Sequence, residues 1–183
     1  MIEPLQLRGV NHLALVCRDM ARTVDFYTNV LGMPLIKTID LPAGSGQHFF
    51  FDMGNGDSLA FFWFPDAPEP APGVAAPVVR PDQGEFLSAM GSMNHVAFDV
   101  APEHIEEYRD RLIAAGVPCS EIWNHDDSEW GLSKEVTDDV FVRSVYFQDP
   151  DGILLELAAW TRRPTGAPDE VTHEPQGSLT SVD

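Results

Sequence analysis

The chain has 183 residues, 44% of them hydrophobic, which is enough to bury one domain core or two fused half-domain cores. Its formal net charge of −18 argues against nucleic acid or an anionic membrane surface as a partner. We find no signal-peptide pattern and no apolar run long enough to span a bilayer, and two cysteines fit a reducing compartment. The sequence therefore predicts a soluble cytoplasmic protein.

The first predicted element is a strand at residues 11–15, with the sequence NHLAL. Alternate side chains of a strand share a face, so His12 and Ala14 lie on one face and the two leucines on the other. A leucine face packs on a helix, whereas a face with histidine and alanine lines something open.

A helix at residues 19–31 follows, and further strands are predicted at residues 47–53 and 56–62. Residues 66–92 are rich in proline, glycine and alanine, which excludes a regular helix or a central strand. We interpret this stretch as a linker.

The pattern then repeats. Residues 94–98, with the sequence NHVAF, predict a second strand whose His95 lies 83 residues after the first histidine. A helix at residues 102–115 and an apolar strand at residues 152–158 complete the second copy. The chain is therefore interpreted as a tandem duplication of a strand–helix–strands unit.

The repeat divides the chain into a first module at residues 8–65 and a second module at residues 93–160, joined by the 66–92 linker. Residues 161–183 contain few apolar residues and predict a disordered acidic tail. The second copy is longer than the first, and the acidic run at residues 123–139 contains the extra length. A loop of this length is often a lid or a partner contact.

Three side chains at matching points of the duplicated unit carry the predicted chemistry: His12, His95 and Glu156. Alternation places Glu156 on the same face as the histidines, where a carboxylate is costly unless it is paired or metal-bound. Two imidazoles and one carboxylate form a three-ligand site for a divalent metal with open positions. The alternative interpretation is two hydrogen-bonded core histidines and a salt-bridge carboxylate.

The sequence resembles the vicinal oxygen chelate superfamily in its paired modules, its two Asn-His strand starts and its DPDG turn at residues 149–152 ahead of Glu156. This superfamily includes glyoxalase I, extradiol dioxygenases, fosfomycin-resistance thiol transferases and metal-free bleomycin-binding proteins. The resemblance implies an α+β fold in which tandem βαβββ modules form a curved mixed sheet around a metal cleft. Glyoxalase I-like members carry a fourth ligand where this chain has Ala60. The remaining set resembles that of the extradiol dioxygenases and of the thiol transferases, and it suits Fe(II), then Mn(II), with Zn(II) or Ni(II) also possible.

Tyr146, ten positions before Glu156, matches a tyrosine of the extradiol enzymes and is a catalytic candidate. The acid–base histidine of those enzymes has no counterpart at residues 56–58, and His48 is the candidate substitute. An aromatic pocket wall is predicted from Phe50, Phe62 and Phe64.

We therefore predict an Fe(II) extradiol-type dioxygenase that takes O₂ and a small catecholic substrate and forms a homodimer. The alternatives are a metal-dependent lyase, isomerase or thiol transferase of the same superfamily, and a metal-free protein that binds small molecules.

Overall fold

Two four-stranded mixed sheets make up the fold, in a computed structural model that describes residues 8–85, 87–168 and 170–175. The strands are β1 (His12–Val16), β2 (Leu35–Asp40), β3 (Gln47–Gly54), β4 (Asp57–Trp63), β5 (Val96–Asp99), β6 (Trp123–His125), β7 (Val142–Gln148) and β8 (Leu154–Trp160). The helices are α1 (Met20–Asp25), continued by a π-helical turn (Phe26–Val30), and α2 (Ile105–Ala114); short 3-10 turns lie at Pro42–Gly44, Pro81–Gln83 and Pro102–His104. The βαβββ order occurs twice, which confirms the predicted fold class.

The two sheets have equivalent topology. Their strand orders are β1-β4-β3-β2 and β5-β8-β7-β6. In the first sheet β1 pairs in parallel with β4, and in the second β5 pairs in parallel with β8. Along β1 exposed and partly buried residues alternate, and Leu13 and Leu15 pack against the core as their alternation predicts. His12 therefore lies on the face of the first sheet that the core does not cover.

Local signals explain most of the element boundaries. Asp19 caps α1 by accepting a hydrogen bond from the Arg22 backbone N–H at 3.1 Å. The β3–β4 hairpin turns at Asn55 and Gly56, which have φ angles of +54° and +83°, the left-handed conformation that asparagine and glycine tolerate. At the other end of this hairpin, Gly46 lies so close to β4 that an added Cβ would stand 2.1 Å from the Trp63 carbonyl oxygen.

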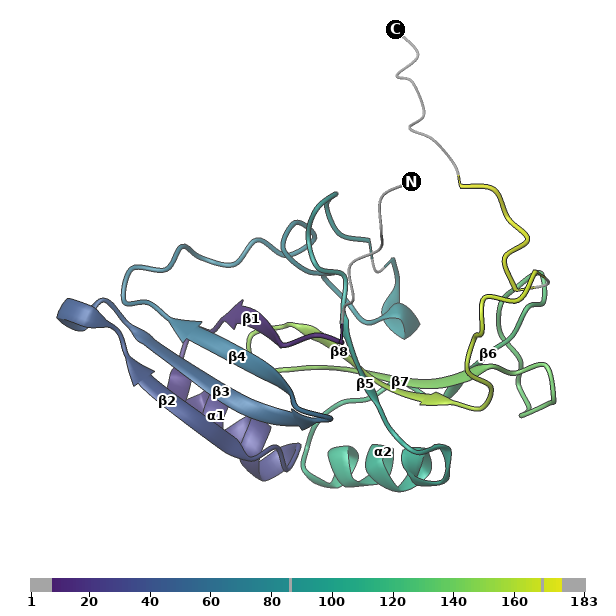
Figure 1. Cartoon of the computed structure of the whole chain (residues 1–183), viewed down its shortest axis with the longest axis horizontal. Helices are drawn as coiled ribbons and strands as arrows, with labels where there is room; N and C mark the ends of the chain where they lie inside the picture. The colour runs from purple at the N-terminus through teal and green to yellow at the C-terminus, as the bar shows by residue number, and fades with distance from the viewer. Residues whose placement is uncertain (1–7, 86, 169, 176–183) are drawn as a thin grey trace, which may run out of the picture.

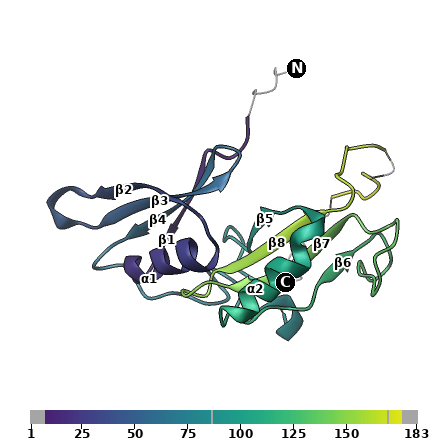
Figure 2. The ribbon, with the colours of Figure 1, turned by 90° about the horizontal axis from the view of Figure 1, so that it is seen from below.

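Both helices lie on the same side of the sheets (Figures 1 and 2), and the linker crosses on the opposite side. One apolar core joins the two modules, with Tyr27, Phe51 and Phe61 from the first and Ile105 and Phe147 from the second among its fully buried members. Each sheet therefore has one face packed against the shared core and its helix and one face turned away from that core.

The DPDG turn fixes the junction between the modules. The buried Asp149 carboxylate accepts hydrogen bonds from the backbone N–H groups of Asp151 and Ile153, at 2.9 and 2.8 Å. Its other oxygen accepts a hydrogen bond from the hydroxyl of Tyr27, in the first module, at 3.1 Å. Asp151 in turn accepts one from the Arg18 backbone N–H at 3.0 Å. The turn therefore links the segments on either side of α1, Arg18 before it and the π-helical turn after it, to the strand that carries Glu156.

Several predicted segments differ in detail. The 123–139 run begins as strand β6 rather than as loop, and α2 starts at Ile105 after a 3-10 turn rather than at residue 102. The predicted tail lies partly outside the described residues; residues 161–168 and 170–175 contain no helix or strand. No helix in the described part of the chain is long and apolar enough to cross a membrane.

Candidate active site

A histidine and a carboxylate meet on the open face of the second sheet. His95 directly precedes β5, Glu156 lies in the middle of β8, and these two strands pair in parallel. His95 Nε2 lies 2.9 Å from Glu156 Oε2, and the Glu156 side chain is buried while 32% of the His95 side chain is exposed. A buried carboxylate is costly without a partner, so the imidazole, alone or with a shared cation, is what stabilises Glu156 in this strand.

Each of the two predicted histidine ligands is held by the asparagine that precedes it. His12 Nδ1 lies 2.8 Å from Asn11 Oδ1, and His95 Nδ1 lies 2.8 Å from Asn94 Oδ1. An amide oxygen only accepts hydrogen bonds, so in both pairs the imidazole proton sits on Nδ1. Nε2 is then the nitrogen that can bind a metal, as in metal-bound histidines oriented by a hydrogen bond to their other ring nitrogen. Without a metal, His95 Nε2 must itself carry a proton to make its 2.9 Å contact with the Glu156 carboxylate.

The geometry of His95 and Glu156 fits a shared metal ion. Two ligand atoms bound at about 2.1 Å and at a right angle to one another stand about 3.0 Å apart. The Nε2–Oε2 distance of 2.9 Å agrees with that value. An imidazole and a carboxylate are ordinary ligands of Fe(II), Mn(II) and Zn(II).

The third predicted ligand does not join this pair within the chain. Among the described residues, no three His, Cys, Asp or Glu side chains come together in a group that could hold a metal. The two modules lie side by side, each with its own sheet and helix (Figure 1), so that the His12 sheet and the Glu156 sheet are separate halves of the molecule. His12 therefore remains exposed on the first sheet.

The predicted aromatic wall lies on the same sheet as His12 and contacts it through Phe50. The His12 ring lies 5.7 Å from the Phe50 ring, and Phe50 lies 4.3 Å from the ring of His48. Phe62 stacks on His48 at 3.6 Å and on Phe64 at 5.4 Å. The first module thus presents one exposed imidazole, that of His12, beside a continuous aromatic face that includes the buried His48.

His48 is a buried member of this stack. Its Nδ1 lies 3.2 Å from the Phe61 carbonyl oxygen, so that carbonyl accepts a hydrogen bond when Nδ1 carries the proton. The ring is nearly parallel to Phe62, at 6°. Nε2 is the nitrogen of His48 that this hydrogen bond leaves for a ligand.

Tyr146 lies directly beside Glu156. The two residues are opposite each other in the β7–β8 pairing, and the Tyr146 ring lies 6.0 Å from the His95 ring. Burial, followed by the charge of Glu156, raises the pKa of Tyr146 to about 12, so its phenol stays protonated at neutral pH. The neighbouring Ser144 hydroxyl is fully buried and has no partner at normal hydrogen-bond geometry among the described residues, although its proximity acts to lower the pKa of Tyr146.

Two further side chains on this face were missed by the sequence analysis. Trp123 and His125 lie on β6, and the Trp123 ring is 5.7 Å from Tyr146 and 6.2 Å from His125. Burial lowers the pKa of His125, while the negative charge of Glu156 acts in the opposite direction, which places His125 within electrostatic reach of that carboxylate. The alternation Trp-x-His was the available signal, but the acidic residues that follow it obscured the strand.

The first sheet has no carboxylate at the position equivalent to Glu156. Ala60 pairs with Ala14 in the first sheet, as Glu156 pairs with Ala97 in the second. The structural register therefore supports the alignment that placed an alanine where a fourth ligand would be.

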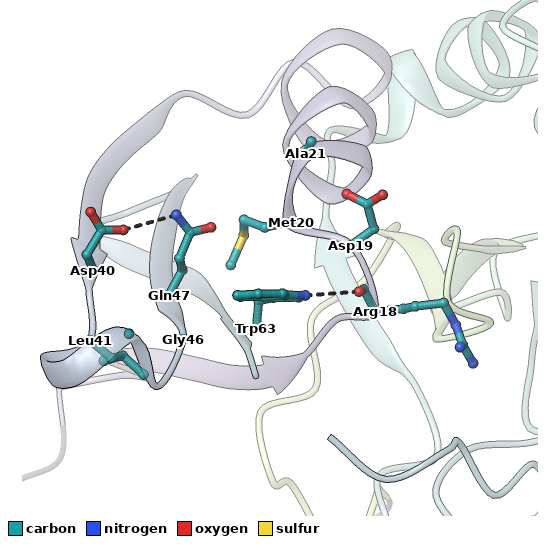
Figure 3. Close-up of a pocket in the computed structure, with 10 residues that line it drawn as sticks. Arg18, Asp19, Met20, Ala21, Asp40, Leu41, Gly46, Gln47 and Trp63 are labelled. Atoms are coloured by element: carbon teal, nitrogen blue, oxygen red, sulfur yellow. Dashed lines mark hydrogen bonds between the residues drawn. The ribbon is translucent and has the colours of Figure 1, made fainter. Parts of the chain in front are cut away.

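A surface cavity of about 760 Å³ lies between the start of α1 and the β2–β3 hairpin (Figure 3), and none of the predicted site residues lines it. Two hydrogen bonds join polar groups of its lining: Trp63 Nε1 donates to the Arg18 carbonyl at 3.2 Å, and Gln47 Nε2 donates to Asp40 Oδ1 at 3.0 Å. It contains no histidine, and we do not assign the candidate active site to it.

Comparison with known proteins identifies the family. Residues 9–157 match the model of the Glyoxalase/Bleomycin resistance protein/Dioxygenase superfamily. The chain belongs to this superfamily. Most members are metal-dependent enzymes, among them transferases, lyases and dioxygenases, and members bind a divalent metal.

The relatives differ in their reactions. A glutathione transferase, FosA of Serratia marcescens, is 28% identical over 151 residues, which cover 82% of this chain and 80% of FosA. A putative ring-cleaving dioxygenase, MhqE of Bacillus subtilis (strain 168), is 26% identical over 121 residues, 64% of this chain but only 35% of MhqE. Among solved structures, that of SMU.1112c has a TM-score of 0.59 with 28% identity and covers 84% of this chain and 99% of its own. These likenesses establish the fold and the family, and the reaction is a separate question.

Proposed function

We propose that the protein is a metal-dependent enzyme whose centre is completed between two copies of the chain. His95 and Glu156 of one copy and His12 of the other are the proposed ligands. The observation that carries the proposal is the 2.9 Å contact between His95 Nε2 and Glu156 Oε2, together with the matching Asn–His pairs in both modules.

The second copy is argued from the open face of the first sheet. Besides His12, this face presents Val16, Ile39 and Phe64, with exposed fractions of 51%, 37% and 36%. Contiguous exposed apolar side chains of this kind mark an interaction surface. A homodimer in which this face covers the second sheet of the partner would bury them and bring a third ligand to His95 and Glu156.

The chemistry we propose is an extradiol-type cleavage of a small catecholic substrate. A divalent metal, Fe(II) first and Mn(II) next, would polarise two vicinal oxygens of the substrate and provide a site for O₂. Both atoms of O₂ enter the ring-opened product, so no external reductant is needed.

The side chains of the chain have separate proposed roles in this reaction. Tyr146, protonated beside Glu156, donates a hydrogen bond to a substrate oxygen. His48, held at Nδ1, exchanges a proton with the substrate through Nε2. Phe50, Phe62 and Phe64 pack against the substrate ring.

A mixing experiment tests the proposed centre. The variants His12→Ala and His95→Ala, each purified without metal, are expected to bind less than a tenth of the wild-type Mn(II). Unfolding and refolding the two variants together should restore binding to about one metal per mixed dimer. Each mixed dimer has two sites, and only one of them receives all three ligands. Glu156→Gln mixed with His95→Ala is the matched control and should restore nothing, because both changes affect the same half-site. Metal binding that each single variant retains in full would refute the ligand set.

A second reaction has support from the FosA relative, which covers most of this chain. A thiol transferase would consume glutathione in the presence of an electrophilic substrate and no O₂, whereas a dioxygenase would consume O₂ with a catechol and no thiol. Oxygen-electrode and thiol-titration assays on the Fe(II)- and Mn(II)-loaded protein separate these reactions. A protein that binds no divalent metal under any loading condition would instead be a metal-free binding protein.

A further inference from the structure

Strand β6 adds an aromatic edge to the open face of the second sheet. Trp123 is opposite Ser144 in the β6–β7 pairing, and Ser144 is opposite Ala158 in the β7–β8 pairing. Strand alternation then places Trp123 and His125 on the same face as Tyr146 and Glu156.

The rings on this face form a continuous series. His95 and Tyr146 lie 6.0 Å apart at 85°, Tyr146 and Trp123 lie 5.7 Å apart at 70°, and Trp123 and His125 lie 6.2 Å apart at 59°. The first two are edge-to-face contacts and the third is tilted, and all three lie within the distance range of favourable aromatic pairs. Trp123 and His125 are only half-buried, so both rings remain accessible to a ligand beside Glu156.

We infer that Trp123 and His125 are substrate-contacting residues of this site, and that they select an uncharged planar aromatic ligand with a hydroxyl group. The Trp123 ring packs against the ring of the ligand, and the His125 imidazole forms a hydrogen bond with the hydroxyl. The inference rests on the proposed function, since it places the ligand at the His95–Glu156 pair.

The charge of this face favours an uncharged ligand. None of the strand positions that share the face of Glu156 in β5 to β8 is a lysine or an arginine, and Glu156 itself is acidic. Arg163, which reaches β5 from residues beyond β8, is already paired with Asp99. Recognition of a phosphonate or phosphate group normally uses charge-assisted hydrogen bonds from arginine or lysine. The histidines and tyrosine on this face provide hydrogen bonds instead.

The test is the calorimetric titration of catechol, which is uncharged in solution at neutral pH, into Mn(II)-loaded protein without oxygen. Trp123→Ala and His125→Ala are each expected to raise the dissociation constant at least about 10-fold while leaving the Mn(II) content unchanged. The matched controls are Trp130→Ala, whose ring is 84% exposed, and His104→Ala, on the helical side of the second module. Both controls should bind the probe like the wild type. Trp123→Leu, which keeps an apolar side chain in β6, replaces Trp123→Ala if the latter does not fold.

Each outcome separates the inference from the proposed function. Unchanged probe binding in the Trp123 and His125 variants overturns the inference while the metal centre stands. Loss of Mn(II) in His125→Ala makes His125 a metal ligand and also overturns it. If the wild type binds no metal, the proposed function fails, and the same titration is carried out on metal-free protein. Weaker probe binding in both variants than in the wild type then supports the inference. No probe binding by the wild type overturns it.

Discussion

The hydrogen bond from Tyr27 to Asp149 gives a prediction about the junction of the two modules. Burial raises the pKa of Asp149 from an ordinary value of 3.8 to about 6, although backbone N–H groups and the Tyr27 hydroxyl act to lower it. The folded state therefore holds this proton more tightly than the unfolded chain does. The stabilising contribution is complete below pH 4 and is lost as the pH rises through about 6. A shift of about two pKa units corresponds to about 3 kcal/mol of free energy of unfolding.

Tyr27→Phe removes the hydroxyl and leaves the fully buried ring in place. At pH 8 the partner is a buried carboxylate, and the lost hydrogen bond should cost about 1.5–3 kcal/mol. At pH 4.5 the partner is a neutral carboxyl group, and the cost should fall to about 0.5–1.5 kcal/mol. On going from pH 4.5 to pH 8, the free energy of unfolding of the variant should therefore fall by about 1 kcal/mol more than that of the wild type.

Urea unfolding at both pH values measures this difference. Tyr108→Phe is the matched control, because Tyr108 lies on α2, and its hydroxyl makes no hydrogen bond within the described residues. The difference in free energy of unfolding between Tyr108→Phe and the wild type should be the same at pH 4.5 and at pH 8. In Asp149→Asn, which has no proton to bind, the fall in stability between pH 4 and pH 6 should be smaller than in the wild type. Equal losses for Tyr27→Phe at the two pH values, or no loss at pH 8, would refute the argument.

Three further predictions follow from single contacts. Asn94→Ala removes the hydrogen bond that orients His95 and should weaken Mn(II) binding about 10- to 100-fold in a metal titration; unchanged affinity would mean that Asn94 does not orient the ligand. Gly46→Ala should lower the free energy of unfolding by about 1–3 kcal/mol, because its Cβ would stand 2.1 Å from the Trp63 carbonyl at a φ of +149°; a thermal melt like that of the wild type contradicts this. Mn(II) at 100 times its dissociation constant should stabilise the wild type by about 2.7 kcal/mol and should not stabilise Glu156→Gln; equal stabilisation of the two would place the metal elsewhere.

Much of the fold could be predicted because the duplicated sequence repeats each signal. The alternation around His12 and His95, the helix cap at Asp19 and the glycine turns all have local causes, and the structure places the predicted strands and helices within a few residues of their expected positions. Strand β2 was not predicted, because it is an edge strand exposed along its whole length and lacks the alternation of a half-buried strand. The three residues of β6 were hidden in an acidic run for a similar reason.

The candidate site could be predicted only in part. The alternation of residues along a strand determines on which face of the sheet a side chain lies, but it does not determine what that face packs against. Alternation placed His12, His95 and Glu156 on open faces, and these assignments agree with the structure. This alternation would be the same whether the open faces of the two sheets met within one chain or between two copies of the chain. What decides is the side on which the helices pack, and here the Tyr27–Asp149 hydrogen bond and the shared core fix both helices on one side. The contact that joins the two modules is thus the same contact that keeps His12 away from His95 and Glu156. The proposed three-ligand centre therefore requires either a second copy of the chain or the loss of this junction, and the mixing experiment distinguishes these two possibilities.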